Sequence, residues 1–100
     1  MLAEIFERSL TADRPPIYYT DALRALWYAA KGDAQTAMDL AQAASSLNAA
    51  WVRAHLHRTN REPGHAGQWY RTAHREPPEM SIERERTSIA LTLLSELTIR

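Results

Sequence analysis

The sequence predicts an all-α protein, and three observations carry that prediction. Apolar residues recur three and four positions apart along most of the chain, which is the spacing of amphipathic helices. No stretch alternates apolar and polar residues long enough to form a convincing strand, and valine, which favours strands, occurs once. Prolines, glycines and capping residues divide the pattern into about six helices, which we expect to form one domain over residues 1–100.

The first two helices have recognisable boundaries. An apolar stripe predicts a short helix over residues 2–10, which must end before the stiff pair Pro15 and Pro16. Thr20 carries the hydroxyl that an N-cap needs, so we expect the second helix to follow it. That helix ends at Gly32, because glycine adopts the left-handed conformation of a helix stop without steric penalty.

The middle pair of helices follows directly. Asp33 is the predicted N-cap of the third helix, whose apolar stripe covers residues 37–44. Asn48 is the predicted N-cap of the fourth helix, which runs through Leu56.

Prolines and a serine bound the last two helices. Pro63 suits the first turn of the fifth helix, which must end before Pro77 and Pro78. Ser81 is the predicted N-cap of a sixth helix with a broad apolar face over residues 82–97.

Two predicted helical hairpins are related by a shift of 29 residues. The stripe of the third helix is matched by the stripe of the fifth: Ala37, Leu40, Ala41 and Ala44 correspond to Ala66, Trp69, Tyr70 and Ala73. The repeat units cover about residues 17–46 and 47–78, and a capping helix follows at about 81–98. The chain therefore contains two successive helix-turn-helix units.

These units resemble the tetratricopeptide repeat, in which a small residue and an aromatic on the first helix face alanine, an aromatic and alanine on the second, and a proline closes the unit. The matching residues are Ala25, Tyr28, Gly32, Asp33, Ala37 and Ala44 in the first unit, and Ala54, Ala66, Tyr70, Ala73 and Pro78 in the second. The units depart from the family in their 29-residue period, where the family uses 34. Asp21 and Ala50 also stand where the family has tryptophan. The resemblance implies a right-handed stack of two hairpins, with a helix before it and a capping helix after it. Segments 51–58 and 68–73 also resemble parts of small proteins of unassigned function, which implies no function here.

The same resemblance assigns a concave face to the first helix of each unit. In the second unit this face carries Asn48, Trp51, His55, Arg58 and Thr59. An aromatic ring, an imidazole and a guanidinium on successive turns could hold a carboxylate or an acidic peptide. An alternative is that His55 and Arg58 pair with an acid of the last helix, such as Glu83 or Glu85, and only hold that helix in place.

In the first unit the corresponding face is apolar. It carries Tyr19, Ala22, Leu26, Ala29 and Ala30. Such a face needs a cover, from the first helix of the chain or from another chain. A stack of two hairpins has two exposed ends and this chain is short, so we expect some apolar face of the molecule to remain for a second copy or a different partner. A homodimer is therefore one expectation.

Composition excludes several classes of function. Lys and Arg together number 12, as do Asp and Glu, so the formal net charge is zero. Without an excess of positive charge, binding to nucleic acid or to an anionic membrane is not expected. There is no cysteine, and no apolar run approaches the roughly 20 residues of a membrane span. With no secretory signal in the sequence, the expected location is the cytoplasm.

The four histidines do not have the spacing of a helical metal site, so no metal or cofactor is predicted. His55 and His57 point to different faces of one helix, and His65 and His74 are nine residues apart. A metal held between different helices stays an open alternative. No phosphate loop or nucleophile elbow is present, so no catalytic residue is predicted.

The sequence therefore predicts a non-enzymatic module for protein–protein interaction, with an acidic protein or peptide as partner. One alternative is a small-molecule-binding protein or small enzyme that uses an interhelical pocket lined by His55, His57, Arg58 and Tyr70. Another is a purely structural subunit of a larger assembly.

Overall fold

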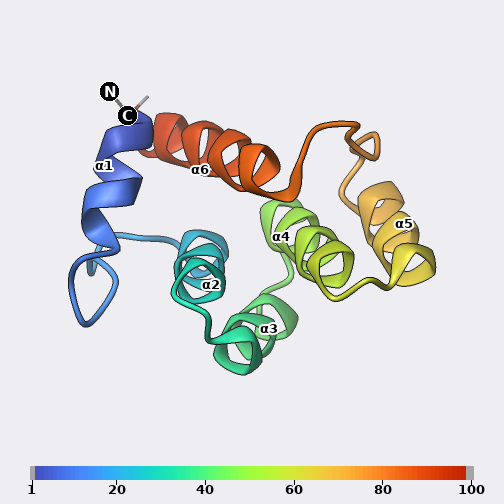
Figure 1. The fold of residues 1–100 in the computed structure, drawn as a ribbon, viewed down its shortest axis with the longest axis horizontal. Coiled ribbons are helices and arrows are strands. Elements are labelled where there is room, and N and C mark those ends of the chain that lie inside the picture. The colour runs from blue at the N-terminus through green and yellow to red at the C-terminus, as the bar shows by residue number, and fades with distance from the viewer. Residues whose placement is uncertain (1, 99–100) are drawn as a thin grey trace.

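The computed structural model describes residues 2–98, and Figure 1 shows them as a compact array of helices. The six helices are α1 (Leu2–Ser9), α2 (Asp21–Ala30), α3 (Ala34–Ala43), α4 (Leu47–Thr59), α5 (Pro63–Thr72) and α6 (Ile82–Thr98). No strand occurs within the described residues. The prediction of an all-α fold with about six helices is confirmed. Among residues 2–98, no helix combines the length and the apolar character needed to cross a bilayer.

Most of the predicted helix boundaries are confirmed. The side-chain oxygens of Thr20, Asp33 and Ser81 each accept a hydrogen bond of 3.1–3.3 Å from the backbone N–H three residues later. These bonds satisfy N–H groups that have no partner within the helix. Gly32 ends α2 with a φ of 90°, and Pro63 is the first residue of α5.

The predicted start of α4 is wrong. Ser46, and not Asn48, is the N-cap, and its Oγ accepts a 3.0 Å hydrogen bond from Ala49 N. Both residue types cap helices well, so the sequence alone does not rank them. With Ser46 as the cap, the Asn48 amide is free to bond across to Glu96 of α6.

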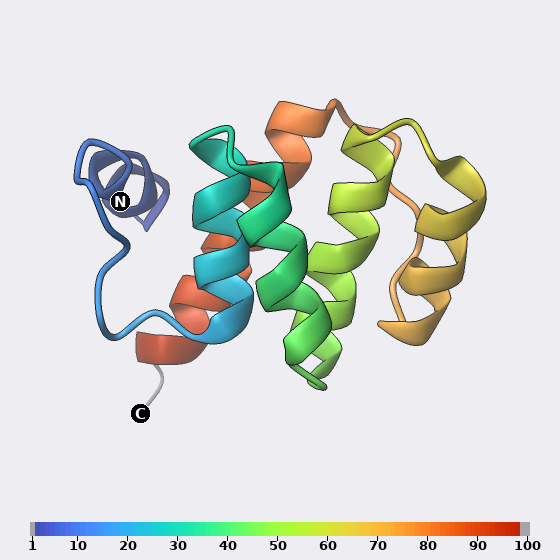
Figure 2. The same cartoon turned by 90° about the horizontal axis from the view of Figure 1, so that it is seen from below.

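The helices form two hairpins with a long helix across them. α2 packs on α3 and α4 packs on α5, while α3 and α4 join the two hairpins (Figures 1 and 2). α6 crosses over α2 and α4 and also contacts α1. Sequence reasoning placed this helix at the open end of the stack, and that placement is wrong. Its wide apolar face, with Ile89, Ala90, Leu93 and Leu94 all buried, is covered along the inner faces of α2 and α4.

α6 therefore lies over α2 and over the face of α4 that the tetratricopeptide resemblance assigned to a ligand. In the first unit the inner-face residues Tyr19, Ala22 and Leu26 are buried, as a covered apolar face requires. The cover comes from α6, which packs against α2, and not from the first helix or another chain as the sequence led us to expect, while α1 packs against α6.

Candidate functional site

The five residues predicted to bind a ligand lie along α4: Asn48, Trp51, His55, Arg58 and Thr59. Asn48 Nδ2 donates a 2.8 Å hydrogen bond to Glu96 Oε1 of α6. The Trp51 ring is covered by the Arg75 guanidinium, whose Cζ lies 3.7 Å from the ring centroid. Thr59 Oγ1 donates a 2.7 Å bond to a carbonyl of its own helix. These three side chains are thus engaged by the chain itself.

The other two predicted residues meet a carboxylate of α6. His55 Nδ1 lies 2.6 Å from Glu85 Oε1, and Arg58 Nη1 donates to the same oxygen at 3.0 Å. Tyr70 of α5 donates a hydrogen bond to Glu85 Oε2, and Arg58 Nη2 donates to the Met80 carbonyl oxygen. We call Glu85, His55, Arg58 and Tyr70 the Glu85 cluster. The predicted pairing of His55 and Arg58 with an acid of the last helix is confirmed at Glu85.

Three helices position the Glu85 cluster. His55 and Arg58 stand three residues apart on α4 and so share one face of it. Tyr70 projects from α5, which packs on α4, while Glu85 comes from the first turn of α6. The cluster therefore ties the start of α6 to both helices of the second hairpin.

The surroundings of the Glu85 cluster shift the pKa of Glu85 and the pKa of Tyr70. Burial raises the pKa of the Glu85 carboxyl, but hydrogen bonds from His55 and Tyr70 outweigh this effect, so its pKa lies below the usual range. Burial, and then the hydrogen bond to Glu85, raise the pKa of the Tyr70 phenol. At neutral pH Glu85 is consequently a carboxylate, and Tyr70 is a neutral phenol that donates to it.

Access to the Glu85 cluster is narrow. The side chains of His55 and Glu85 are 2% and 3% exposed, whereas the Arg58 side chain is 26% exposed. An incoming ligand could therefore touch the guanidinium but would reach the imidazole or the carboxylate only if α6 moved. His57, which the enzyme alternative placed in the same pocket, contacts Glu62 and not the Glu85 cluster.

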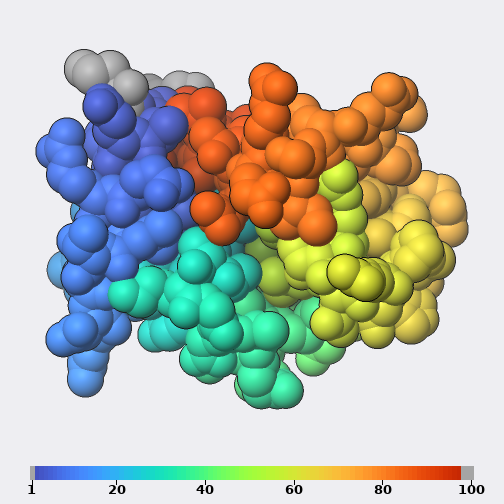
Figure 3. Space-filling view, viewed as in Figure 1, coloured from blue at the N-terminus to red at the C-terminus, as the bar shows by residue number. Residues whose placement is uncertain are grey.

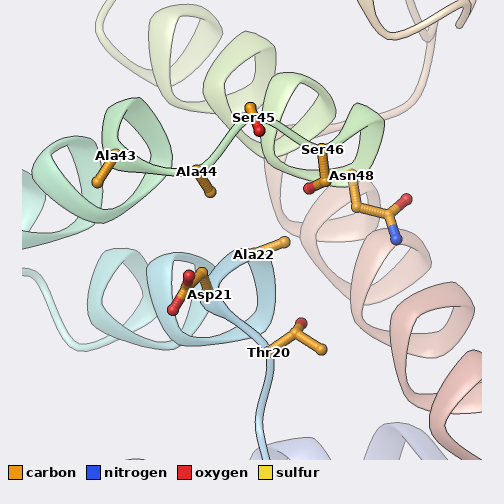
Figure 4. A pocket seen from close by; sticks show the side chains of 8 residues that line it. All are labelled: Thr20, Asp21, Ala22, Ala43, Ala44, Ser45, Ser46 and Asn48. Carbon is orange, nitrogen blue, oxygen red and sulfur yellow. The ribbon is translucent and has the colours of Figure 1, made fainter.

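An open hollow of about 500 Å³ lies next to this face (Figure 4). It is lined by Thr20, Asp21, Ala22, Ala43, Ala44, Ser45, Ser46 and Asn48. The N-terminal ends of α2 and α4 both border it, but Thr20 and Ser46 already cap these ends. The hollow is shallow and lined by small side chains, and Asn48 is the one predicted site residue that reaches it.

A feature that sequence reasoning missed is the turn at residues 16–19, between α1 and α2. Tyr19 N donates a 3.1 Å hydrogen bond to Pro16 O and closes the turn, which leaves Ile17 and Tyr18 at its tip. Ile17 is 101% exposed and Tyr18 is 60% exposed. A β-branched residue is uncommon at a turn tip, where Gly, Asn and Asp dominate, so local conformation does not explain Ile17.

The turn is held in place by buried neighbours. Tyr19 is buried and stacks on Phe6 of α1, with ring centroids 6.4 Å apart, and its hydroxyl bonds to Ser9 Oγ at 3.2 Å. Trp27 Nε1 donates to Ser9 O at 3.1 Å, and the exposed Lys31 donates to the carbonyl oxygens of Leu10 and Ala12, so these bonds hold the end of α1 and the chain just after it. Figure 3 shows the segment between α1 and α2 projecting from one end of the molecule.

No family model, curated protein or solved structure matches this chain. The tetratricopeptide resemblance therefore depends on the residues and spacings of the two units.

Proposed function

We propose that the protein is a non-enzymatic protein-interaction module that binds an acidic partner protein through the turn of residues 16–19. The observation that carries this proposal is the complete exposure of Ile17 beside the largely exposed Tyr18, on a turn whose last residue, Tyr19, is buried against Phe6 and bonded to Ser9 of α1. Aromatic and apolar anchors dominate the binding energy of protein interfaces, and a preformed anchor loses little conformational entropy on binding.

The surroundings of the turn favour an acidic partner. An open hollow of about 580 Å³ lies beside it, lined by Arg14, Pro15, Pro16, Ile17, Tyr19, Arg24 and Tyr28. Arg24 pairs with Asp21 at 3.2 Å, whereas Arg14 stands exposed at the rim. A partner that places an apolar pocket over Ile17 can therefore set a carboxylate against Arg14.

The inner face has a different role in this proposal. The tetratricopeptide resemblance assigns that face to a bound peptide, and in this chain α6 lies there with Glu85 and Glu96 on the α4 residues. We infer that the acid-binding residues of α4 serve the chain's own acidic helix. This occupancy supports a stable module whose partner binds elsewhere, and the turn of residues 16–19 offers that second surface.

Site-specific photo-cross-linking tests the proposal. A photoreactive phenylalanine derivative is placed at position 17 of the full chain, in cells that naturally make the protein. Position 47 is the matched control, because Leu47 is also an exposed apolar residue, at 55% exposure, but lies at the start of α4. We expect one discrete adduct with an acidic protein from position 17 and none from position 47.

The chemistry of the turn gives a second readout. Tyr18→Ser should weaken the purified complex by at least about 30-fold, as loss of an interface anchor does. An adduct with a second copy of the chain would show that the turn mediates a homodimer, and the proposal of an acidic partner would be wrong. The absence of any adduct specific to position 17 would remove the turn as a binding surface.

A further inference from the structure

Two histidines and a glutamate converge at the connection between α4 and α5. His57 lies in the last turn of α4, Glu62 directly precedes α5, and His65 lies in the first turn of α5. Each residue offers one metal-binding atom, and these three atoms lie within 4.8 Å of one another. His65 is exposed, while His57 and Glu62 are half-buried, so an ion from solvent can reach the group.

The backbone of the connection creates this convergence. Glu62 N donates a 2.9 Å hydrogen bond to His57 O, and Arg61 N donates to Arg58 O at 3.1 Å. This pair of bonds is a Schellman helix stop, and it requires Arg61 to be left-handed, with a φ of 59°. The reversal returns Glu62 to the side of His57. Three residues later, the first turn of α5 presents His65 on the same side.

The first hairpin has the same stop but other side chains. Asp33 N donates to Tyr28 O at 2.9 Å and Gly32 N donates to Ala29 O at 3.1 Å, each 29 residues before its counterpart. There the acid caps its helix, since Asp33 Oδ1 accepts a hydrogen bond from Thr36 N at 3.1 Å.

In the second hairpin the acid behaves differently. Glu62 makes no side-chain cap on α5, and its carboxylate lies 2.8 Å from His57 Nδ1. The 29-residue shift also replaces Tyr28 by His57 and Thr36 by His65. The second hairpin therefore has His57, Glu62 and His65 where the first has Tyr28, Asp33 and Thr36, and these three residues bring metal-binding atoms together at the same helix stop.

The two nitrogens of the His57 ring have unlike surroundings. Nδ1 faces Glu62, whereas Nε2 is buried and has no hydrogen-bond partner. A buried imidazole nitrogen without a partner is uncommon, because leaving it unsatisfied costs free energy. The ring of His65 lies close by, with its centroid 5.2 Å from that of His57.

We propose that His57, Glu62 and His65 form a binding site for one divalent transition-metal ion of the zinc class. Two imidazoles and one carboxylate are a ligand set that zinc accepts, whereas calcium and magnesium prefer oxygen ligands alone. Ligands about 2.0–2.1 Å from a tetrahedral ion lie roughly 3.3 Å apart. The 2.8 Å contact between His57 Nδ1 and Glu62 therefore has to open around the ion, and any pair near the 4.8 Å limit has to close. Three protein ligands leave a fourth position for water or for a partner's carboxylate.

Binding of Co²⁺ and Zn²⁺ to the untagged full-length protein tests the site. Co²⁺ reports its own geometry, because a tetrahedral ion absorbs visible light much more strongly than the hydrated octahedral ion. We expect one Co²⁺ per chain with the strong absorption, displacement of Co²⁺ by Zn²⁺, and a rise in melting temperature with Zn²⁺.

Variants separate this site from adventitious binding. His65→Ala removes an exposed ligand, so the variant should fold normally yet lose at least about tenfold in Zn²⁺ affinity. Glu62→Gln should also weaken binding. His74→Asn is the matched control, because His74 is an exposed histidine outside the group, and asparagine tolerates its φ of 59°. Equal Zn²⁺ affinity in the wild type and His65→Ala, or weak octahedral Co²⁺ absorption, would overturn the proposal.

Discussion

Replacement of Glu85 by alanine should be among the most destabilising single changes in this protein. The carboxylate receives hydrogen bonds from His55, Arg58 and Tyr70, and its side chain is 3% exposed. Alanine would delete all three bonds together and leave the imidazole and the phenol buried without this partner. The change also releases the start of α6 from α4 and α5.

The contacts set the magnitude. Removal of one partner from a buried charged group costs about 3–5 kcal/mol, because the remaining groups lose their compensation. The Arg58 side chain is 26% exposed, and water can replace part of its lost bond. We therefore expect Glu85→Ala to lower the free energy of unfolding by about 4 kcal/mol, a large share of the 5–15 kcal/mol typical of a small domain.

Glu85→Gln refines the test, because glutamine keeps the shape of the side chain. Its amide oxygen can accept from His55 and Arg58, and its NH₂ group can donate to the Tyr70 hydroxyl, which rotates to accept. Only the charge assistance is lost, so about 2–3 kcal/mol is expected over the three bonds. Glu83→Ala is the matched control, since Glu83 is exposed on the same helical turn and should change stability by no more than about 0.5 kcal/mol.

Urea unfolding followed by tryptophan fluorescence and by helical circular dichroism measures all three variants. The order of stability should be Glu83→Ala, then Glu85→Gln, then Glu85→Ala. If Glu85→Ala lay within about 1 kcal/mol of Glu83→Ala, the Glu85 cluster would not hold α6 and the reasoning from its contacts would be refuted.

Two further predictions concern pH and the connection between α4 and α5. The pKa of Glu85 is lowered in the folded protein, so its stabilising effect is complete above the usual value of 4.5 and is lost as the pH falls through the lower folded value. Urea unfolding between pH 7 and pH 3 should therefore show a steeper acid loss in the wild type than in Glu85→Gln, and parallel curves would contradict this. Arg61→Gly should raise the free energy of unfolding by about 0.5–1 kcal/mol, because glycine relieves the left-handed strain at φ 59°. A fall in stability measured by the same method would contradict that reasoning.

Local sequence signals predicted the elements of the fold well, because they act within a few residues. Caps such as Thr20, Asp33 and Ser81 bond to N–H groups three positions away, and Gly32 meets a purely local steric demand. The position of α6 depends on packing between distant segments. The apolar stripe of α6 indicated that this helix is buried on one side, but periodicity does not show which other helices it packs against.

The sequence predicted which residues of the candidate site pair, but it did not predict that His55 and Glu85 are buried. Opposite charges on facing helices suggested that His55 and Arg58 would meet Glu83 or Glu85, and Glu85 is the partner. The spacing of Tyr70 indicated packing, while the alternative of an interhelical pocket grouped it with His55 and Arg58. Tyr70 in fact does both, since its ring is buried and its hydroxyl donates to Glu85.

The group at the end of α4 was missed for a different reason. Neither His55 with His57 nor His65 with His74 has the spacing of a helical metal site, and a metal held between different helices was an open alternative without named ligands. The 29-residue repeat contained the missing signal, because it aligns Glu62 with the helix cap Asp33 and His65 with Thr36. When the two hairpins are aligned by this shift, the helix stops share their backbone hydrogen bonds, and the residues that differ at the second stop are the proposed metal ligands.

That comparison also separates the roles of the two hairpins. At its helix stop the first hairpin uses glycine in the left-handed position and an aspartate that caps the next helix, which are the residues that backbone geometry favours. The second hairpin makes the same stop with Arg61, and Glu62 leaves α5 without a side-chain cap. Both choices weaken local stability, and local departures of this kind concentrate where a protein binds a ligand. The first hairpin is thus a structural frame with the proposed interaction turn at its edge, while the second gives up local stability at the point where we place the metal ion.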